Sequence, residues 1–121
     1  MKIYLLYLLF SIIALNFNSC DTQNCVELNG DFQNYKQAKN VITKTDFNYS
    51  DQIITSKSSW ILKADFYSCN NVNGYFLLST KSKTYIHKGL PMEVWLNFKK
   101  ASSFGTFYNK NIKDKYQLRL R

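Results

Sequence analysis

The sequence is poor in residues that interrupt or loosen a fold, with one proline and four glycines among 121 residues. This scarcity argues against a long flexible linker, in which glycine or proline would be abundant. The chain also lacks the polar composition of a disordered protein, because 45% of its residues are hydrophobic and 17% are aromatic. Its length allows one small domain with a modest core, at a size where stability is marginal.

Side chains that catalyse reactions or bind metals are also scarce, since the chain has one histidine and three cysteines. No motif gives His87 an orienting carboxylate and a nucleophile, so we interpret it as a packing or surface residue. The alternative is an enzyme that uses Cys69 as a nucleophile with His87. No CxxC pair or Cys/His spacing indicates a metal site. We therefore predict a protein without catalytic residues, metal or cofactor.

The first 19 residues have the layout of a secretory signal peptide. Lys2 supplies a positive charge, residues 3–15 are apolar apart from Ser11, and polar and small residues follow at 16–19. The apolar stretch is shorter than the ~20 residues that a membrane-spanning helix needs. We therefore predict that residues 1–19 are removed after export.

Cys20 directly follows the small residue Ser19, and this junction resembles the lipobox of bacterial lipoprotein precursors. Phe17 and Asn18 depart from that motif, which prefers leucine and a small residue at these positions. The resemblance implies cleavage before Cys20, lipid on its thiol, and anchoring to the inner or the outer membrane of the bacterial cell envelope. Several acyl chains anchor stably, because each buried CH₂ contributes ~0.8 kcal/mol. A plain signal peptide followed by a chance cysteine is the alternative.

With Cys20 assigned to the anchor, Cys25 and Cys69 remain as an even pair in an oxidising compartment. A disulfide between them would close a loop of 44 residues. The chain-entropy model gives such a loop a stabilisation of ~4 kcal/mol, which a small domain needs. Two free or buried thiols are the alternative.

Acidic residues are almost missing from the last third of the chain. Residues 20–79 carry five lysines against six acidic residues, a net charge of −1. Residues 80–121 carry ten basic residues against two acidic ones, a net charge of +8. A basic surface of this kind suits phosphates, acidic glycans or an anionic membrane. A solvated surface that keeps the protein soluble is the alternative.

The periodicity along the chain predicts an α+β fold that begins with a helix. Residues 20–30 are polar and form a predicted tether. In the segment 31–58, Asp31 is the predicted cap of the helix, and a connector without clear periodicity follows at 46–57. The helix has one apolar stripe, made of Phe32, Tyr35, Ala38 and Val41 or Ile42.

From residue 59 the hydrophobic period changes to two, which is typical of half-buried strands. Strands are predicted at 60–67, 75–80 and 84–87, with a turn at 70–74, and they form an antiparallel meander of about three strands. Pro91 suits the first turn of a helix at 92–101, with Val94, Trp95 and Phe98 as candidate core residues. On the first strand, Trp60, Leu62, Ala64 and Phe66 alternate with Ile61, Lys63, Asp65 and Tyr67.

An aromatic and basic segment completes the chain, and several residue types stand at set spacing within it. Aromatic rings between cations can hold single-stranded nucleic acid by stacking and phosphate neutralisation. The same pattern arises when aromatics fill a small core, and we interpret Phe107 and Ile112 in this way. Ser103, Gly105 and Asn109 suit local backbone roles. Two short stretches before this segment belong to the same pattern. The stretches are Tyr85-Ile86-His87, Leu90-Pro91 and Ser103-Phe104-Gly105-Thr106-Phe107-Tyr108-Asn109-Lys110-Asn111-Ile112, followed by Tyr116.

These stretches resemble the KTSC domain, a short module named for the C-terminus of some lysyl-tRNA synthetases, over residues 59–116 within a predicted domain at 59–121. His87 stands where the second central tyrosine of the family lies, which weakens any role that depends on a tyrosine pair. RNA binding has been suggested for the family, but an exported protein rarely meets RNA. The resemblance leaves the helix after Asp31 without a counterpart.

We therefore expect a non-enzymatic binding or interaction module, anchored to the envelope membrane, with an envelope protein or a polyanion as its partner. An RNA- or polyanion-binding domain is the alternative, although nucleic acid is not an expected partner for an exported chain. The candidate binding surface consists of Tyr85, His87, Phe104, Tyr108, Asn109, Lys110, Lys113 and Tyr116.

Overall fold

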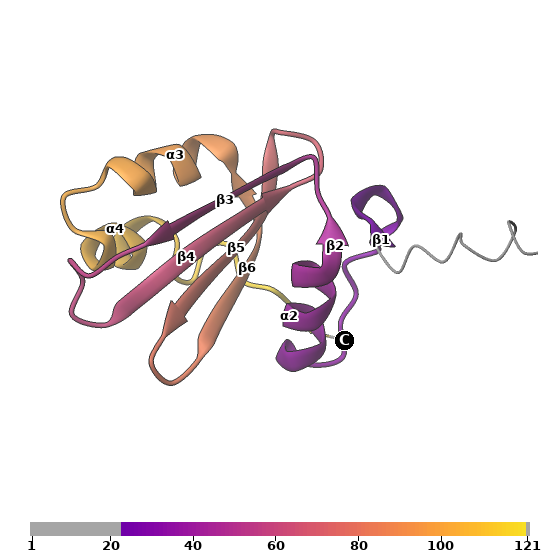
Figure 1. Ribbon diagram of the computed structural model, residues 1–121, viewed down its shortest axis with the longest axis horizontal. Helices are drawn as coiled ribbons and strands as arrows, with labels where there is room; N and C mark the ends of the chain where they lie inside the picture. Colours follow the sequence, from indigo (N-terminus) through magenta and orange to yellow (C-terminus); the bar gives the residue numbers. More distant parts are fainter. Residues whose placement is uncertain (1–22, 121) are drawn as a thin grey trace, which may run out of the picture.

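The computed structural model describes residues 23–120, so the predicted signal peptide and Cys20 lie outside the described residues. The chain forms an antiparallel four-stranded sheet in the order β3-β4-β5-β6, with helices on both faces (Figure 1). The α+β prediction is confirmed. The elements are β1 (Gln23–Asn24), the 3₁₀ helix η2 (Cys25–Glu27), α2 (Tyr35–Lys44), β2 (Thr45–Asp46), β3 (Tyr49–Ile54), β4 (Ile61–Ser68), β5 (Asn73–Thr80), β6 (Thr84–Pro91), α3 (Met92–Lys100) and α4 (Phe104–Asn111).

Strand β3 is the element that the sequence pattern missed, so the sheet has four strands where about three were predicted. Its odd-numbered residues are half-buried and its even-numbered residues are exposed. One of the half-buried residues is the charged Asp51, and the exposed positions include the apolar Ile54. The apolar period of two is therefore absent, although the strand itself alternates.

The first helix begins later than predicted. The side chain of Asn34 accepts a hydrogen bond from the backbone N–H of Gln37 at 2.8 Å, so Asn34 rather than Asp31 caps α2. Ala38 and Ile42 are buried as the apolar stripe predicted, but Tyr35 is 55% exposed. The region predicted as a tether also differs, since its residues 23–27 form β1 and η2, and β1 pairs with β2.

A register shift in β4 changes which side chains face the core. Ala64 and Phe66 are buried, whereas Leu62 is exposed and Ile61 is buried in its place. The shift lies between Ile61 and Lys63 in the pairing with β5, and an extra residue at such a bulge reverses the alternation. The predicted strand is therefore present, but its simple alternation of buried and exposed side chains is not, because Asp65 between Ala64 and Phe66 is buried as well.

Strand β6 extends to Pro91, four residues beyond the predicted end at His87. Gly89 has a φ of +74°, a backbone conformation that favours glycine, and the strand passes through it without ending. The sequence placed Pro91 in the first turn of the next helix. In the structure Pro91 is the residue just before α3, its N-cap. The aromatic and basic segment after α3, for which no structure was predicted, contains the second C-terminal helix, α4.

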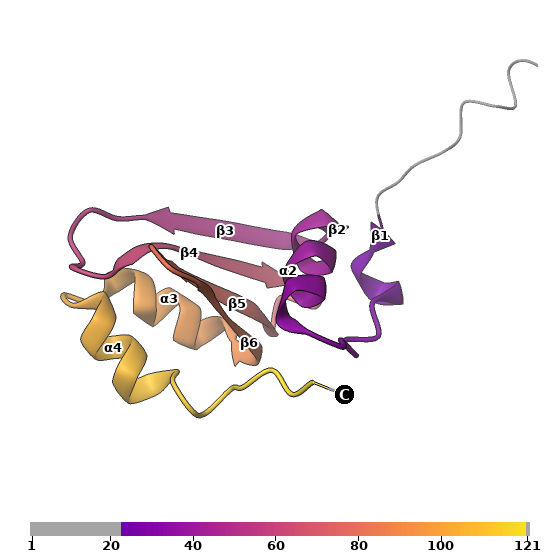
Figure 2. The same cartoon turned by 90° about the horizontal axis from the view of Figure 1, so that it is seen from below.

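The sheet separates two hydrophobic clusters, and Figure 2 shows α3 and α4 together on one side of it. Helices α3 and α4 cover one face, where Trp95 and Ile112 are fully buried against the central strands. Helix α2 packs on the opposite face through Ala38 and Ile42. Within residues 23–120, no helix has the length and apolar character needed to cross a membrane.

Candidate binding cleft

Helix α4 is capped at Ser103 and approaches Trp60 closely at Gly105. The Ser103 hydroxyl accepts a hydrogen bond from the backbone N–H of Thr106 at 3.3 Å and caps the helix. A Cβ atom added at Gly105 would lie 2.8 Å from Nε1 of Trp60, so the site has no room for a larger residue unless Trp60 moves. This close approach brings Tyr108, one turn further along, against β6.

Tyr108 and His87 meet at the centre of this contact. The Tyr108 hydroxyl lies 2.9 Å from Nε2 of His87, and both residues are buried. Burial lowers the pKa of His87 from 6.5 to about 4, an effect that the Tyr116 carbonyl and the charge of Asp114 partly offset. Burial also raises the pKa of Tyr108 to about 12. Both groups are therefore neutral at pH 7.

The chain after α4 turns back and runs beside β6. Asp114 has a φ of +64°, in the left-handed region, where the chain reverses direction. The backbone N–H of Lys88 then donates to the Tyr116 carbonyl at 2.9 Å, and His87 forms a bridge with Gln117. Nδ1 of His87 is buried beside this segment, and no described group completes a well-formed hydrogen bond with it, although the Tyr116 carbonyl favours the protonated ring.

These elements enclose a cleft of about 440 Å³ between β6, the end of α4 and the start of α2. Two exposed tyrosines, Tyr35 and Tyr85, lie on its walls. The Lys83 ammonium lies 4.4 Å from the centre of the Tyr85 ring, within the range of a cation–π contact. The remaining lining residues are Thr84, Ile86, His87, Tyr108, Lys113, Asp114, Gln117 and Leu118.

The comparisons with known proteins concern this part of the chain. Residues 78–116 match the KTSC domain model. The chain is also similar to a KTSC domain protein from Yersinia pestis, with 27% identity over 60% of this chain and 99% of that chain, at a TM-score of 0.49. No curated protein matches the chain. The match to the family model supports the resemblance inferred from sequence for residues 78–116, here called the KTSC segment.

The KTSC segment supplies most of the cleft. Of the residues predicted for a binding surface, the structure brings four together around the cleft: Tyr85, His87, Tyr108 and Lys113. His87 belongs to the buried floor, so it is a packing residue in contact with the site. His87, the residue that departs from the family pattern, forms its hydrogen bond with Tyr108 here.

The other four predicted residues do not line the cleft. Phe104 packs on Phe98 with ring centres 5.1 Å apart. Tyr116 is half-buried against the α3/α4 cluster and contributes its backbone carbonyl. Asn109 and Lys110 are exposed elsewhere on α4. The two residues interpreted as core both pack there, Ile112 fully buried and Phe107 half-buried.

Sequence reasoning missed several residues of the cleft, notably Tyr35 and Lys83. Lys83 belongs to the turn before β6, and its position two residues before Tyr85 places both on the same side of a strand. This spacing could have indicated that Lys83 lies beside Tyr85. Tyr35 comes from α2, outside the KTSC segment, and no spacing within the sequence relates it to Tyr85.

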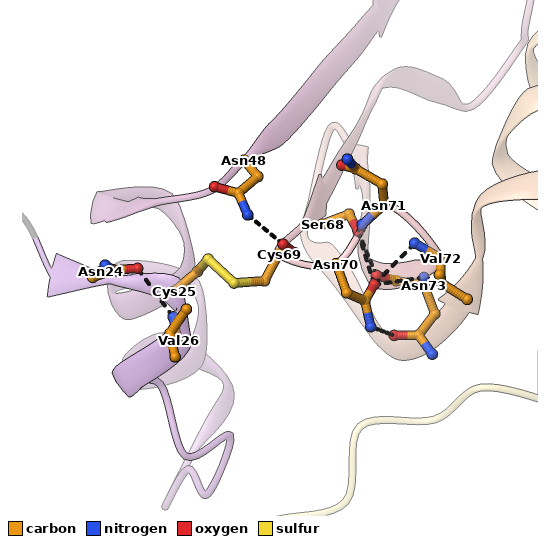
Figure 3. The surroundings of a disulfide bond; sticks show 10 residues. All are labelled: Asn24, Cys25, Val26, Asn48, Ser68, Cys69, Asn70, Asn71, Val72 and Asn73. Carbon is orange, nitrogen blue, oxygen red and sulfur yellow. Dashed lines mark hydrogen bonds between the residues drawn. A yellow bond between two sulfur atoms is a disulfide. The ribbon is translucent and has the colours of Figure 1, made fainter.

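A disulfide joins Cys25 to Cys69, the two cysteines that the sequence analysis paired (Figure 3). Their Cα atoms are 5.8 Å apart. The bond ties η2 to the turn between β4 and β5, where the Asn48 side chain also donates to the Cys69 carbonyl. Among residues 23–120, no three His, Cys, Asp or Glu side chains gather into a set that could hold a metal ion.

Proposed function

We propose that this chain is a membrane-anchored, non-enzymatic module of the bacterial cell envelope that binds its ligand in the cleft beside β6. The observation that carries the proposal is the combination of Tyr35 and Tyr85 on the walls with Lys83 and Lys113 at the same opening. Ligand sites typically combine apolar or aromatic walls with a few placed polar groups, in clefts of ~300–1,000 Å³.

The lining favours a ligand that combines a flat or apolar ring with a negative charge. Aromatic faces provide the surface on which a ring can stack. Lys83 and Lys113 supply two positive charges against the single negative charge of Asp114. The hydrogen-bonded pair on the floor, His87 and Tyr108, is uncharged at pH 7, so ligand charge would be met at the rim.

The same pair is the reason for proposing a binding protein rather than an enzyme. An effective general acid or base has a pKa near the working pH. The pKa of His87 is lowered to about 4 and that of Tyr108 is raised to about 12, so each is displaced away from neutrality.

A second candidate is the binding of a polyanion such as RNA, and the exposed lysines of the KTSC segment favour it. Lys99, Lys100, Lys110 and Lys113 are all exposed, and they lie on or just after the two C-terminal helices. Binding through phosphate contacts releases counterions and weakens steeply with salt. A cleft ligand is held by stacking as well as by two lysines, so its binding should weaken less steeply with salt than binding to a polyanion.

The test is photo-crosslinking in intact cells, with the crosslinking amino acid placed at Tyr85. The matched control carries it at Leu96, which is similarly exposed but lies on α3, away from the cleft. Adducts specific to Tyr85 that disappear in a Lys83→Glu, Lys113→Glu background support the cleft. Equal adducts at both positions contradict it. Binding lost in high salt, with adducts spread over α3 and α4, supports the polyanion candidate.

The anchor is tested separately with Cys20→Ser. The serine has no thiol to acylate, so the protein should leave the membrane fraction and lose labelling by a radioactive fatty acid. Cys25→Ser, in a cysteine assigned to the disulfide, is the control and should remain in the membrane fraction. A Cys20→Ser protein that still fractionates with membranes contradicts the proposed anchor.

A further inference from the structure

The two edges of the sheet differ in how they are protected. At the β6 edge, the chain after α4 covers the strand through the hydrogen bond from Lys88 to Tyr116 and the bridge between His87 and Gln117. At the other edge, β3 pairs only with β4 among the described residues, and Figure 2 shows no element beyond it. Among residues 23–120, β3 is therefore the one edge of the four-stranded sheet that no other segment pairs with or covers, and it is six residues long.

Strand β3 lacks three features that usually prevent edge-to-edge pairing, namely lysine, proline and a bulge, but it has a fourth, an inward-pointing charge, in Asp51. Its sequence from Tyr49 to Ile54 contains neither residue type, and its pairing with β4 is continuous over six residues. Its one charge, Asp51, is held by Lys99 and Trp95 of α3. Ile54, at the end of the strand, is 77% exposed.

The pairing with β4 determines which backbone groups of β3 are free. The N–H of Thr55 donates to the carbonyl of Leu62, so the odd-numbered residues of this stretch direct their backbone groups toward β4. Backbone direction alternates along a strand. The N–H and carbonyl groups of Ser50, Gln52 and Ile54 therefore point outward from the sheet.

We infer that two copies of this chain pair antiparallel through β3, with the two-fold axis at Gln52. Gln52 then faces the second Gln52, and Ser50 faces Ile54, so all three outward residues find partners within the strand. A pairing shifted to centre on Asp51 would place two carboxylates directly opposite each other, which is unfavourable. In the pairing centred on Gln52, Asp51 faces Ile53 instead.

This pairing is self-limiting. A two-fold contact uses the same surface on both copies, and it would leave only the two covered β6 edges at the ends of a continuous eight-stranded sheet. A dimer therefore forms rather than a fibre. The hydrogen bond from the Gln52 amide to Asp65 holds the Gln52 side chain over the sheet face, away from the backbone groups that pair.

The geometry is tested by cysteine crosslinking of the full chain. Facing residues in an antiparallel pair have Cα atoms ~4.5–5.5 Å apart, within disulfide range. Mild oxidation of Gln52→Cys should therefore give a covalent dimer on a non-reducing gel. Val72→Cys is the control, because Val72 is exposed in the turn between β4 and β5, and it should remain monomeric. Equal crosslinking of the two variants, or none with Gln52→Cys, would overturn the inference.

The register is tested with Ser50→Cys and Ile54→Cys, which should form a crosslink when mixed but not when oxidised alone. A dimer of Ser50→Cys with itself would overturn the register centred on Gln52. The unmodified chain in detergent should sediment with twice the protein mass of one copy. Ile54→Lys should halve that mass by adding a charge to the edge, and Val72→Lys should not change it. Sedimentation of the unmodified chain as single copies would also overturn the inference.

Discussion

The hydroxyl of Tyr108 lies 2.9 Å from Nε2 of His87, although the two residues are 21 positions apart and belong to different elements. This hydrogen bond joins α4 to β6 beneath the cleft. His87 is 5% exposed and Tyr108 is 4% exposed, so neither polar atom has ready access to solvent. The bond therefore contributes to stability. It also holds together β6 and α4, which both line the cleft.

We expect Tyr108→Phe to lower the free energy of unfolding by ~1–3 kcal/mol, because the substitution leaves Nε2 of His87 buried without its partner. Urea denaturation measures the change. Tyr85→Phe is the control, since Tyr85 is partly exposed and its hydroxyl can bond to water. Its expected effect is below ~0.5 kcal/mol. Equal losses in the two variants would contradict the role of the buried hydrogen bond.

The protein should lose stability between pH 6.5 and pH 4 because of His87, whose pKa falls from 6.5 to about 4 on folding. The stabilisation is fully present above pH 6.5. As the pH falls through this window, the unfolded chain binds a proton that the folded chain does not. The loss amounts to about 3 kcal/mol in all. Unfolding free energies measured across the range should decline with this slope.

His87→Gln is the control for this pH dependence, because glutamine does not titrate and can still accept from Tyr108. Its stability should be lower than that of the unmodified protein at pH 7, but nearly constant from pH 6.5 to pH 4.5. A slope that remains unchanged in His87→Gln would assign the pH dependence to other groups.

The KTSC resemblance and helix α3 could be predicted because local residue types determine them. Pro91 marks the start of α3, and the turn residues at 70–74 followed by a run of apolar residues mark β5. Strand β3 could not be predicted in this way, since one of its inward positions holds Asp51. That carboxylate is tolerated only because Lys99 and Trp95, more than forty positions away, hydrogen-bond to it.

The cleft was only partly predictable for a related reason. Tyr85, Tyr108 and Lys113 lie in one recognisable sequence pattern, so their grouping had a local signal. Tyr35 reaches the same cleft from α2 on the other face of the sheet, and only the tertiary fold relates the two parts. The bulge at Ile61 is similar, because one extra residue reverses the faces of a strand without changing its composition.

Removing the disulfide with Cys25→Ser and Cys69→Ser together should lower the free energy of unfolding by ~4 kcal/mol in the chain-entropy model, since the bond closes a loop of 44 residues. Urea denaturation of the double variant measures this loss. Adding a reductant to the unmodified protein should give a similar loss, but should leave the double variant unchanged. Mass mapping without reductant should recover Cys25 and Cys69 in one crosslinked peptide pair; two alkylatable thiols would contradict the bond.

The last prediction concerns Asp51, whose carboxylate accepts hydrogen bonds from Tyr49, Trp95 and Lys99. Burial tends to raise the pKa of Asp51, but hydrogen bonds from Lys99, Trp95 and the backbone of Gln52 hold it below its usual value. Trp95 is fully buried. Asp51→Ala should therefore cost ~1–3 kcal/mol, because it leaves the indole N–H without a partner.

Lys99→Met should lower the free energy of unfolding much less than Asp51→Ala, by less than ~1 kcal/mol. The Lys99 ammonium lies near the surface, so water can take its place as a hydrogen-bond partner of Asp51. Lys100→Met, next to it on α3, is the control for loss of one positive charge. Urea denaturation of the three variants gives the comparison. If Lys99→Met costs as much as Asp51→Ala, the ion pair rather than the buried indole N–H is the main contribution of Asp51, and the link between β3 and α3 should weaken with salt.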